Sequence, residues 1–392
     1  MQRHNATVSA LVLDAIGQLI EKEGPPQSRL VQAVIDLSRL FTKERTELNR
    51  SYLEDPTAAT AYLNYFMPVN LSKIQVLLDE VPIDRLPDRL SVLDLGSGPG
   101  TGSLAVLDWW HRRQCAHSVE VVAIDNSPSA LTQATQLWNR YCQAAGITAA
   151  SFQSHKGDLE QAAWLTQVRL RAPFDLIILA NSLNEIYTGA QEPIGARTNF
   201  VTKALSLLAP SGTMMIVEPA LRETSRALHH VRDRLIQEKQ CTVFSPCLHE
   251  NSCPALVNPY DWCHEERAWD PPTVIRQIDD EVGFIKDALK FSYLLLRKDG
   301  KTIVDRRPDV YRVVSELRAM KGEKRAWLCN EQGRQEVGRQ DRLASPQNEA
   351  FDVWHRGALV QIERIIRKEK GGKVSALGRI ERDVAVEMIR PA

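Results

Sequence analysis

The chain contains the stretch Ser91-Val-Leu-Asp-Leu-Gly-Ser-Gly-Pro-Gly-Thr-Gly-Ser-Leu-Ala105, in which a buried strand, a glycine loop and the start of a helix follow one another directly. Gly96, Gly98 and Gly100 have no Cβ, so the backbone of this loop can turn tightly and approach a ligand closely. We expect the N–H groups of the loop and the N-terminus of the next helix to point into a cavity. The pattern predicts a nucleotide-type pocket.

A second apolar strand, Val119–Ile124, leads directly into Asp125. An acid at this position is placed to accept hydrogen bonds from both hydroxyls of an adenosine ribose. The loop Gly-Ser-Gly-Pro-Gly-Thr-Gly departs from the dinucleotide fingerprint Gly-x-Gly-x-x-Gly, and it lacks the Lys-Ser/Thr pair of a triphosphate-binding loop. We therefore expect a ribose-binding pocket without a triphosphate site. The alternative is an ordinary strand-to-helix turn in another kind of α/β protein.

This combination resembles the class I S-adenosylmethionine-dependent methyltransferases. The resemblance implies that Asp94 lies near the methionine end of the cofactor, that Asp125 binds the ribose and that Asp158 meets the adenine amino group. The predicted S-adenosylmethionine site consists of Asp94, Gly96, Gly98, Gly100, Asp125, Asp158 and Asn181.

Polar residues follow a further apolar strand that begins at Phe174. In parallel α/β sheets, ligands bind in the crevice outside the carboxyl ends of the strands. Asn181, Asn184 and Glu185 are therefore candidates for holding the methyl acceptor or the methionine moiety, and they are the catalytic candidates. The alternative interpretation is that they cap the start of a helix.

Strands and helices alternate regularly along residues 86–297, which predicts an α/β fold. We predict a class I methyltransferase-like doubly wound sheet with N-terminal helices, a cysteine-rich insertion and a small C-terminal β region. The expected units are an N-terminal helical region at 1–85, the methyltransferase-like domain at 86–297 with its insertion at 241–290, and a basic, β-rich region at 298–392.

Aromatic residues gather ahead of the glycine loop, within and after a segment whose apolar side chains have helical spacing. These aromatic side chains either stack on bases or cover the cofactor, or they pack the N-terminal helices onto the sheet. They are Phe41, Tyr52, Tyr62, Tyr65 and Phe66.

The composition is that of an ordinary globular protein, because 43% of the 392 residues are hydrophobic and the 49 basic residues balance the 49 acidic ones. No apolar run reaches the length of a membrane span, and the N-terminal residues lack the pattern of a signal or transit peptide. We expect a cytoplasmic protein of bacterial origin with no membrane partner.

Basic residues recur in the predicted C-terminal β region, and we expect them to form a face that binds the phosphates of RNA. The alternative is a solvated charged face without a partner. The residues concerned are Arg306, Arg307, Arg312, Arg318, Lys321, Lys324 and Arg325.

Four of the seven cysteines, Cys247, Cys253, Cys263 and Cys329, lie in the insertion and on a later strand turn. A set of four thiols suits four-coordinate binding of zinc or of an iron–sulfur cluster, and their spacing does not decide between the two. Buried structural cysteines are one alternative. Another is that Cys247, in Ser-Pro-Cys, is the nucleophile of a cytosine-C5 methyltransferase. We expect Cys115 and Cys142 to be plain core residues.

Several further segments extend the resemblance over most of the chain. They include Ala61-Tyr-Leu-Asn-Tyr-Phe-Met-Pro68, Ser245-Pro-Cys-Leu-His-Glu250, Cys253-Pro254, Asp261-Trp-Cys-His264 and Lys290-Phe-Ser-Tyr-Leu294. Together with the glycine loop, they resemble the methyltransferase-like family of mitochondrial small-ribosomal-subunit proteins and assembly factors, which has bacterial members.

The family resemblance implies a 4Fe-4S cluster bound by Cys247, Cys253, Cys263 and Cys329. It also implies a partner, the small ribosomal subunit and its RNA. We therefore predict an S-adenosylmethionine-dependent methyltransferase that acts on small-subunit ribosomal RNA or in assembly of that subunit. The alternative is a non-catalytic assembly or RNA-binding factor with a structural zinc or iron–sulfur site.

Overall fold

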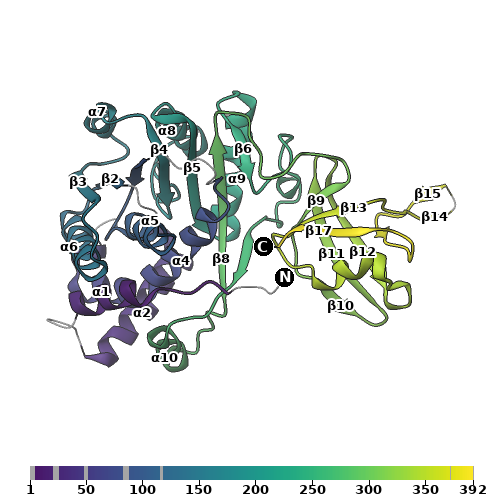
Figure 1. Cartoon of the computed structure of the whole chain (residues 1–392), viewed down its shortest axis with the longest axis horizontal. Helices are drawn as coiled ribbons and strands as arrows, with labels where there is room; N and C mark the ends of the chain where they lie inside the picture. The colour runs from purple at the N-terminus through teal and green to yellow at the C-terminus, as the bar shows by residue number, and fades with distance from the viewer. Residues whose placement is uncertain are drawn as a thin grey trace.

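The computed structural model describes residues 5–20, 26–47, 52–82, 88–114, 118–370 and 372–391. Two β-sheets lie side by side in it, and the long strand β8 stands on the side of the larger sheet that faces the smaller one (Figure 1). Cys115 lies outside the described residues, so its predicted place in the core is not addressed by the structure.

The larger sheet has the strand order β3-β2-β1-β4-β5-β8-β6, and β7 pairs with β8 at one end. β1 to β5 are parallel, and β8 runs antiparallel to β5, β6 and β7. Its strands are β1 (Arg89–Leu95), β2 (Ser118–Asp125), β3 (Ala150–Lys156), β4 (Phe174–Ala180), β5 (Leu208–Pro219), β6 (Thr242–Ser245), β7 (Glu265–Ala268) and β8 (Ala288–Arg297). This arrangement confirms the predicted class I methyltransferase-like sheet.

Helices cover both faces of this sheet. One face carries α1 (Ala10–Ile20), α2 (Gln27–Thr42), α4 (Met67–Leu78), α5 (Thr101–Arg112) and α6 (Pro128–Ala145), and the other carries α7 (Ala163–Arg169), α8 (Pro193–Leu205) and α9 (Arg222–Gln237). Adjacent strand residues alternate between the two cores, as Val92 and Leu93 do in β1. Because both faces are buried, the strands are apolar almost throughout.

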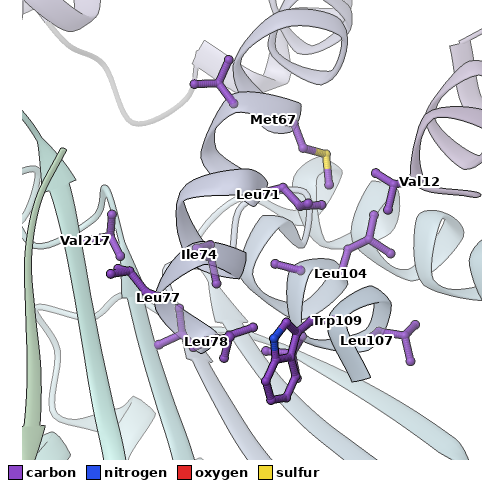
Figure 2. Close-up of a cluster of buried hydrophobic side chains, with 14 of the residues drawn as sticks. Val12, Met67, Leu71, Ile74, Leu77, Leu78, Leu104, Leu107, Trp109 and Val217 are labelled. Carbon is purple, nitrogen blue, oxygen red and sulfur yellow. The ribbon is translucent and has the colours of Figure 1, made fainter. Parts of the chain in front are cut away.

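The N-terminal helices share one core with the sheet. Met67, Leu71 and Ile74 of α4 pack against Leu104 of α5 and Val12 of α1, and the same cluster reaches β5 (Figure 2). The described N-terminal helices are therefore one layer of the methyltransferase-like fold.

The predicted insertion also adds to the larger sheet. It contains β7, which pairs with β8, and the helix α10 (Thr273–Val282), whose Ile275 and Ile278 enter the core shared with the N-terminal helices. Only the cysteine-bearing segment between β6 and β7 has little regular structure, since it contains a single short 3-10 helix, Pro254–Leu256.

The C-terminal region forms a second sheet with a core of its own. Its strand order is β16-β12-β11-β9-β13-β17, and β10 pairs with β11. The strands are β9 (Val310–Val313), β10 (Arg318–Met320), β11 (Glu323–Asn330), β12 (Gly333–Gln340), β13 (Leu359–Ile362), β16 (Gly378–Arg379) and β17 (Val386–Arg390), and β14 (Glu369–Lys370) and β15 (Lys373–Val374) form a separate two-stranded ribbon.

Four buried charges connect the two sheets. Arg312 of β9 donates to Glu265 of β7 at 2.6 Å, and Arg267 pairs with Glu265 at 2.7 Å and with Glu80, after α4, at 2.8 Å. Burial alone would raise the pKa of Glu80, and the positive charges of Arg312 and Arg267 outweigh burial and lower it. Two acids and two bases thus neutralise one another at the junction, where loss of one partner would leave a buried charge unpaired.

This junction corrects the prediction of a basic RNA-binding face. Arg312 is only 4% exposed, so it contributes nothing to a surface. The other pairs are Arg306 with Glu250, Arg307 with Asp309, Arg318 with Glu336, Lys324 with Asp352 and Arg325 with Glu323. Carboxylates therefore pair with most of the basic residues that the sequence pattern shows, and the partners of Arg306, Arg318 and Lys324 are distant in sequence.

Among the described residues, every helix is too short or too polar to cross a membrane.

Candidate functional site

A cavity of about 410 Å3 opens at the carboxyl ends of the parallel strands. Each of the cofactor-binding and catalytic candidates predicted from the sequence lines it, with the exception of Gly100. Asp94 comes from β1, Asp125 from the end of β2 and Asp158 from just after β3, so successive strands each contribute one acid. The structure thus gathers residues that are separated by up to 91 positions in the sequence.

The glycine loop is a close-fitting turn between β1 and α5. Gly96 has a φ of +70°, and a Cβ there would lie 2.5 Å from the Cβ of Ser182, so only glycine fits. Gly102 lies in the first turn of α5, where a Cβ would lie 2.8 Å from a carboxylate oxygen of Asp94. The loop therefore holds the cavity wall against two neighbouring segments.

The expectation that the N–H groups of the loop point into the cavity is wrong for most of them. Gly96 and Ser97 donate to the carbonyl of Ile124 at 2.8 and 3.0 Å, Gly98 donates to the Asp125 carboxylate at 2.8 Å, and Gly100 donates to Ser97. An N–H group has one proton to donate, so these groups are not available to a phosphate. This bonding pattern suits a ligand with no phosphate beside the loop.

Asp94 is an almost fully buried acid, 1% exposed, at the floor of the cavity. Its Oδ2 accepts from the backbone N–H of Ser103 at 2.8 Å and from the Ser103 hydroxyl at 2.7 Å. Burial raises the pKa of Asp94 to about 6, although the Ser103 bonds oppose that rise. A cationic group bound nearby would favour the ionised carboxylate.

Asp125 is held in place from both sides. Its two carboxylate oxygens accept from the N–H groups of Gly98 and Ser127 at 2.8 and 2.9 Å. Each oxygen has a further lone pair for a ligand hydroxyl. The short 3-10 helix Tyr52–Glu54 covers this end of the cavity, because Glu54 accepts a 2.5 Å hydrogen bond from the Ser127 hydroxyl.

Asn181, Asn184 and Glu185 all line the cavity. The Asn184 amide donates to the carbonyl of Asn181 at 2.9 Å and accepts from Arg45. These residues form a turn, and α8 begins only at Pro193, where Glu192 supplies the cap. The alternative interpretation, a capped helix start at residues 181–185, is therefore wrong.

Glu218, at the end of β5, supports this turn from behind. It is 1% exposed, and its Oε1 accepts from the backbone N–H of Asn184 at 3.2 Å. Within the described part of the chain, its Oε2 has no hydrogen-bond partner. Burial raises the pKa of Glu218 to about 8, so this side chain is mainly a neutral carboxylic acid at pH 7.

The aromatic residues ahead of the loop occupy two kinds of place. Phe41, Tyr52, Tyr62 and Phe66 line the cavity, whereas Tyr65 is buried in the core and donates to Asp279. A π-helical turn, Tyr62–Phe66, joins α3 (Pro56–Ala61) to α4, and such wide turns are frequent at functional sites. The aromatic residues therefore form one wall of the cavity and also join it to the helical layer.

A second cavity, of about 50 Å3, is lined by Cys247, Cys253, Cys263 and Cys329 together. Cys329 comes from β11, directly opposite Arg312 in the pairing of β9 with β11. Because Arg312 is bound to Glu265, two residues after Cys263, the buried charges that join the sheets also bring Cys329 to the other three thiols. Burial raises the pKa of Cys263 to about 11, which keeps this thiol protonated.

The cysteine-bearing segment is held by one face of α9. Arg226 donates to the carbonyls of Ala255, Asn258 and Asp261 at 2.8 to 3.1 Å. Arg232 donates to the carbonyls of His249 and Asn251, and His229 bonds the carbonyl of Cys263 at 3.0 Å. These three α9 side chains are three residues apart, so they share a face of the helix.

No group of three or more His, Cys, Asp or Glu side chains within the described ranges is arranged to hold a single metal ion. Cys247 lines the second cavity, and it is not among the described residues that line the first. The alternative of a cytosine-C5 nucleophile requires the thiol beside the methyl donor. The structure therefore disfavours it.

A protein-family model matches the part of the chain that contains most of this site. The family model of the mitochondrial small ribosomal subunit protein Rsm22 matches residues 56–339, which include most of the residues that line the two cavities. The chain belongs to the Rsm22 family. The match covers the glycine loop, the aromatic wall from Tyr62 onward and all four cysteines of the second cavity. Among curated proteins, no match was found.

Three solved structures are similar to parts of the chain at low sequence identity. The methyltransferase CcbJ of Streptomyces caelestis is 15% identical, with a TM-score of 0.26, and the match covers 38% of this chain and 52% of CcbJ, about half its length. A proposed class I S-adenosylmethionine-dependent methyltransferase from Listeria monocytogenes is 16% identical over 77% of this chain and 83% of its own, with a TM-score of 0.38. The mitomycin 7-O-methyltransferase MmcR is 14% identical over 61% and 71%, with a TM-score of 0.35.

Sequence reasoning missed several residues around the first cavity. Glu218, Arg45, Lys73 and Lys286 belong to none of the sequence motifs. A charged residue inside an otherwise apolar strand end, as in Glu218-Pro219, was the one local signal available.

The buried Glu218 acid predicts a distinctive pH dependence of stability. The folded state keeps its proton up to about pH 8, whereas the unfolded chain releases it near the ordinary value of 4.5, so stability is lost as pH rises between these values. Wild type should lose up to about 1.4 kcal/mol of unfolding free energy per pH unit over this range. Glu218→Gln has no proton to release, so it should not show this loss. Urea unfolding at pH 5 to 8 measures the difference, with the exposed Glu238→Gln as control. If the unfolding free energies of wild type and Glu218→Gln change equally with pH, the assignment of Glu218 as a buried neutral acid is contradicted.

Proposed function

We propose that this Rsm22-family protein binds S-adenosylmethionine in the strand-end cavity and acts as a methyltransferase on small-subunit ribosomal RNA or in the assembly of that subunit. The single observation that supports this most is the placement of Asp94, Asp125 and Asp158 at three successive strand ends in one cavity. The order of the acids along the sheet suits a cofactor lying across β1, β2 and β3, with its methionine part nearest Asp94.

The side chains fit the parts of such a cofactor. Asp125 would accept from the ribose hydroxyls, Asp158 would lie at the adenine, and Asp94 would offset the positive charge of the methionine end. When bound, S-adenosylmethionine supplies an electrophilic methyl group. The protein's part is to hold an acceptor in line with it and to exclude water, and the aromatic wall and the turn at residues 181–185 are placed for both tasks.

The ribosomal partner is supported by family membership. Because most of the predicted basic face is neutralised by carboxylates, we place the RNA-binding contribution at the mouth of the cavity instead. Small-subunit RNA would then reach the pocket directly.

The cofactor assignment predicts that Asp125→Ala weakens binding of S-adenosylmethionine about 10-fold to 100-fold. The substitution leaves the ribose hydroxyls without an acceptor and also releases the Gly98 N–H that Asp125 holds. Isothermal titration calorimetry measures the loss. Asp280→Ala, at an exposed position of α10, is the matched control and should bind like wild type. Absence of binding to the wild-type protein would refute the proposal.

A second candidate function, a non-catalytic assembly factor, is favoured by one observation. The Asn184 amide already accepts from Arg45 and donates to the carbonyl of Asn181, so only its second N–H and a second lone pair remain for an acceptor. Tritiated S-adenosylmethionine incubated with isolated small ribosomal subunits separates the two functions. Transfer of the label to RNA supports the enzyme, and co-sedimentation without transfer supports the assembly factor.

We further propose that Cys247, Cys253, Cys263 and Cys329 bind a 4Fe-4S cluster. The four thiols line one cavity, and the family resemblance implies that they bind a cluster, with a single zinc ion as the alternative. The cluster would tie β11 to the cysteine-bearing segment, beside the buried ion pairs of the junction.

The cluster proposal predicts that protein purified without oxygen is brown and contains iron and sulfide. Cys253→Ser or Cys263→Ser should abolish the visible absorbance, because a thiolate ligand is lost. Cys241→Ser should retain it, since Cys241 is partly buried on the same stretch and does not line the cavity. If the wild-type protein is colourless and contains one zinc ion, the cluster proposal is contradicted and the site is a structural zinc site.

A further inference from the structure

The charged residues of the first cavity are segregated along the sheet. The acids Asp125 and Asp158 lie at β2 and β3, whereas Lys286 and Lys290 lie at β8, on the far side of β1, β4 and β5. Four strand spacings separate β2 from β8, which is roughly 19 Å. Lys73 of α4 lines the cavity as well. Asp94 at β1 and Glu185 after β4 line the cavity between these two ends. The cavity therefore has an acidic half, along β3, β2, β1 and β4, and a lysine half beside β8 with three lysine side chains.

The lysine half has little counter-charge of its own. Lys73 is 9% exposed, and its Nζ donates to the Asn70 side chain at 2.9 Å. Within the described residues, no carboxylate lies within ion-pair distance of Lys73 or Lys286. The nearby acid Asp279 accepts from the Tyr65 hydroxyl and from the Lys286 backbone N–H. Lys290, at the rim, pairs with Glu266 at 3.4 Å.

Burial and the neighbouring Lys286 together lower the pKa of Lys73 to about 7. Burial also lowers the pKa of Lys286, although Asp279 opposes this. Two positively charged lysines close together in a partly buried cavity repel each other, and a bound anion reduces this repulsion. A bound anion would favour the charged form of both lysines.

Flat aromatic faces lie along the same cavity. The ring centroids of Phe41 and Phe66 are 5.1 Å apart in an edge-to-face contact, and the Tyr62 and Phe66 rings are 6.1 Å apart and nearly parallel, at 25°. Arg45, between the two halves, is bound to Asn184 and to the carbonyl of Phe41. A ligand here would combine a flat, apolar body with an anion.

We propose that the lysine half, made of Lys73, Lys286 and Lys290, binds the phosphate of an acceptor nucleotide whose base packs against Phe41 and Phe66. This inference rests on the proposed function, because it assigns the acidic half to S-adenosylmethionine. Ammonium groups form charge-assisted hydrogen bonds with phosphate, and bases stack on aromatic side chains. The subsite would place one nucleotide of the RNA beside the methyl donor.

The test is calorimetry of each ribonucleoside 5′-monophosphate and of the matching nucleoside, with the protein saturated by S-adenosylhomocysteine. At least one monophosphate should bind about ten-fold tighter than its nucleoside and tighter than inorganic phosphate. The double variant Lys73→Gln, Lys286→Gln should remove this difference, and Lys73→Arg, which keeps the charge, should retain much of it. Lys203→Gln, exposed on α8, is the control and should behave like wild type.

The outcomes separate the two proposals. Equal binding of monophosphate and nucleoside, with S-adenosylhomocysteine bound, would overturn the phosphate subsite and leave the cofactor site standing. If inorganic phosphate binds as tightly as the monophosphates, the lysine half binds free phosphate and the assignment of a nucleotide is overturned. Lysine-dependent binding of a monophosphate without binding of S-adenosylhomocysteine would support the subsite and refute the cofactor site. If the double variant is unfolded by its melting curve, Lys286→Gln alone, at a half-buried position, carries the same prediction.

Discussion

The burial of both faces of the larger sheet is the constraint on which the rest of the structure depends. Helices cover each face, so the interiors of the parallel strands β1, β2, β4 and β5 are mainly apolar, whereas β3, at the edge of the sheet, is largely polar. Polar side chains are tolerated where the strands end. All carboxyl ends of β1 to β4 meet at one edge, which gathers Asp94, Asp125, Asp158 and Asn181. The same constraint keeps Glu218 neutral, because its carboxyl lies just inside that edge, where charge is unfavourable.

A second set of contacts, the buried charges Glu80, Glu265, Arg267 and Arg312, positions the smaller sheet. The charges of these two acids and two bases add up to zero, and the ion pairs hold β9 against β7. Since Cys329 lies opposite Arg312 in the neighbouring strand, the fourth thiol reaches the cysteine cavity as a consequence of that docking. A metal cluster at this point would reinforce a junction that the ion pairs already define.

Much of the fold was predictable, because the strand and helix patterns around Asp94 and Asp125 are local. The bonding of the loop N–H groups was not, since their acceptors, Ile124 and Asp125, belong to the next strand. Arg312 was misinterpreted as a surface residue for the same reason: its partner Glu265 is 47 residues away, and no local pattern reveals it. Lys73 was missed because a lysine on a helix ordinarily faces solvent, whereas nearly every residue of α4 is buried.

The most direct test of the central claim is a crystal structure of the protein with S-adenosylhomocysteine. The account predicts the ribose hydroxyls within hydrogen-bond distance of the Asp125 carboxylate, the adenine beside Asp158 and the homocysteine end toward Asp94 and Gly96. A ligand bound elsewhere, or one lying in the cavity with its adenine at the lysines near β8, would contradict it.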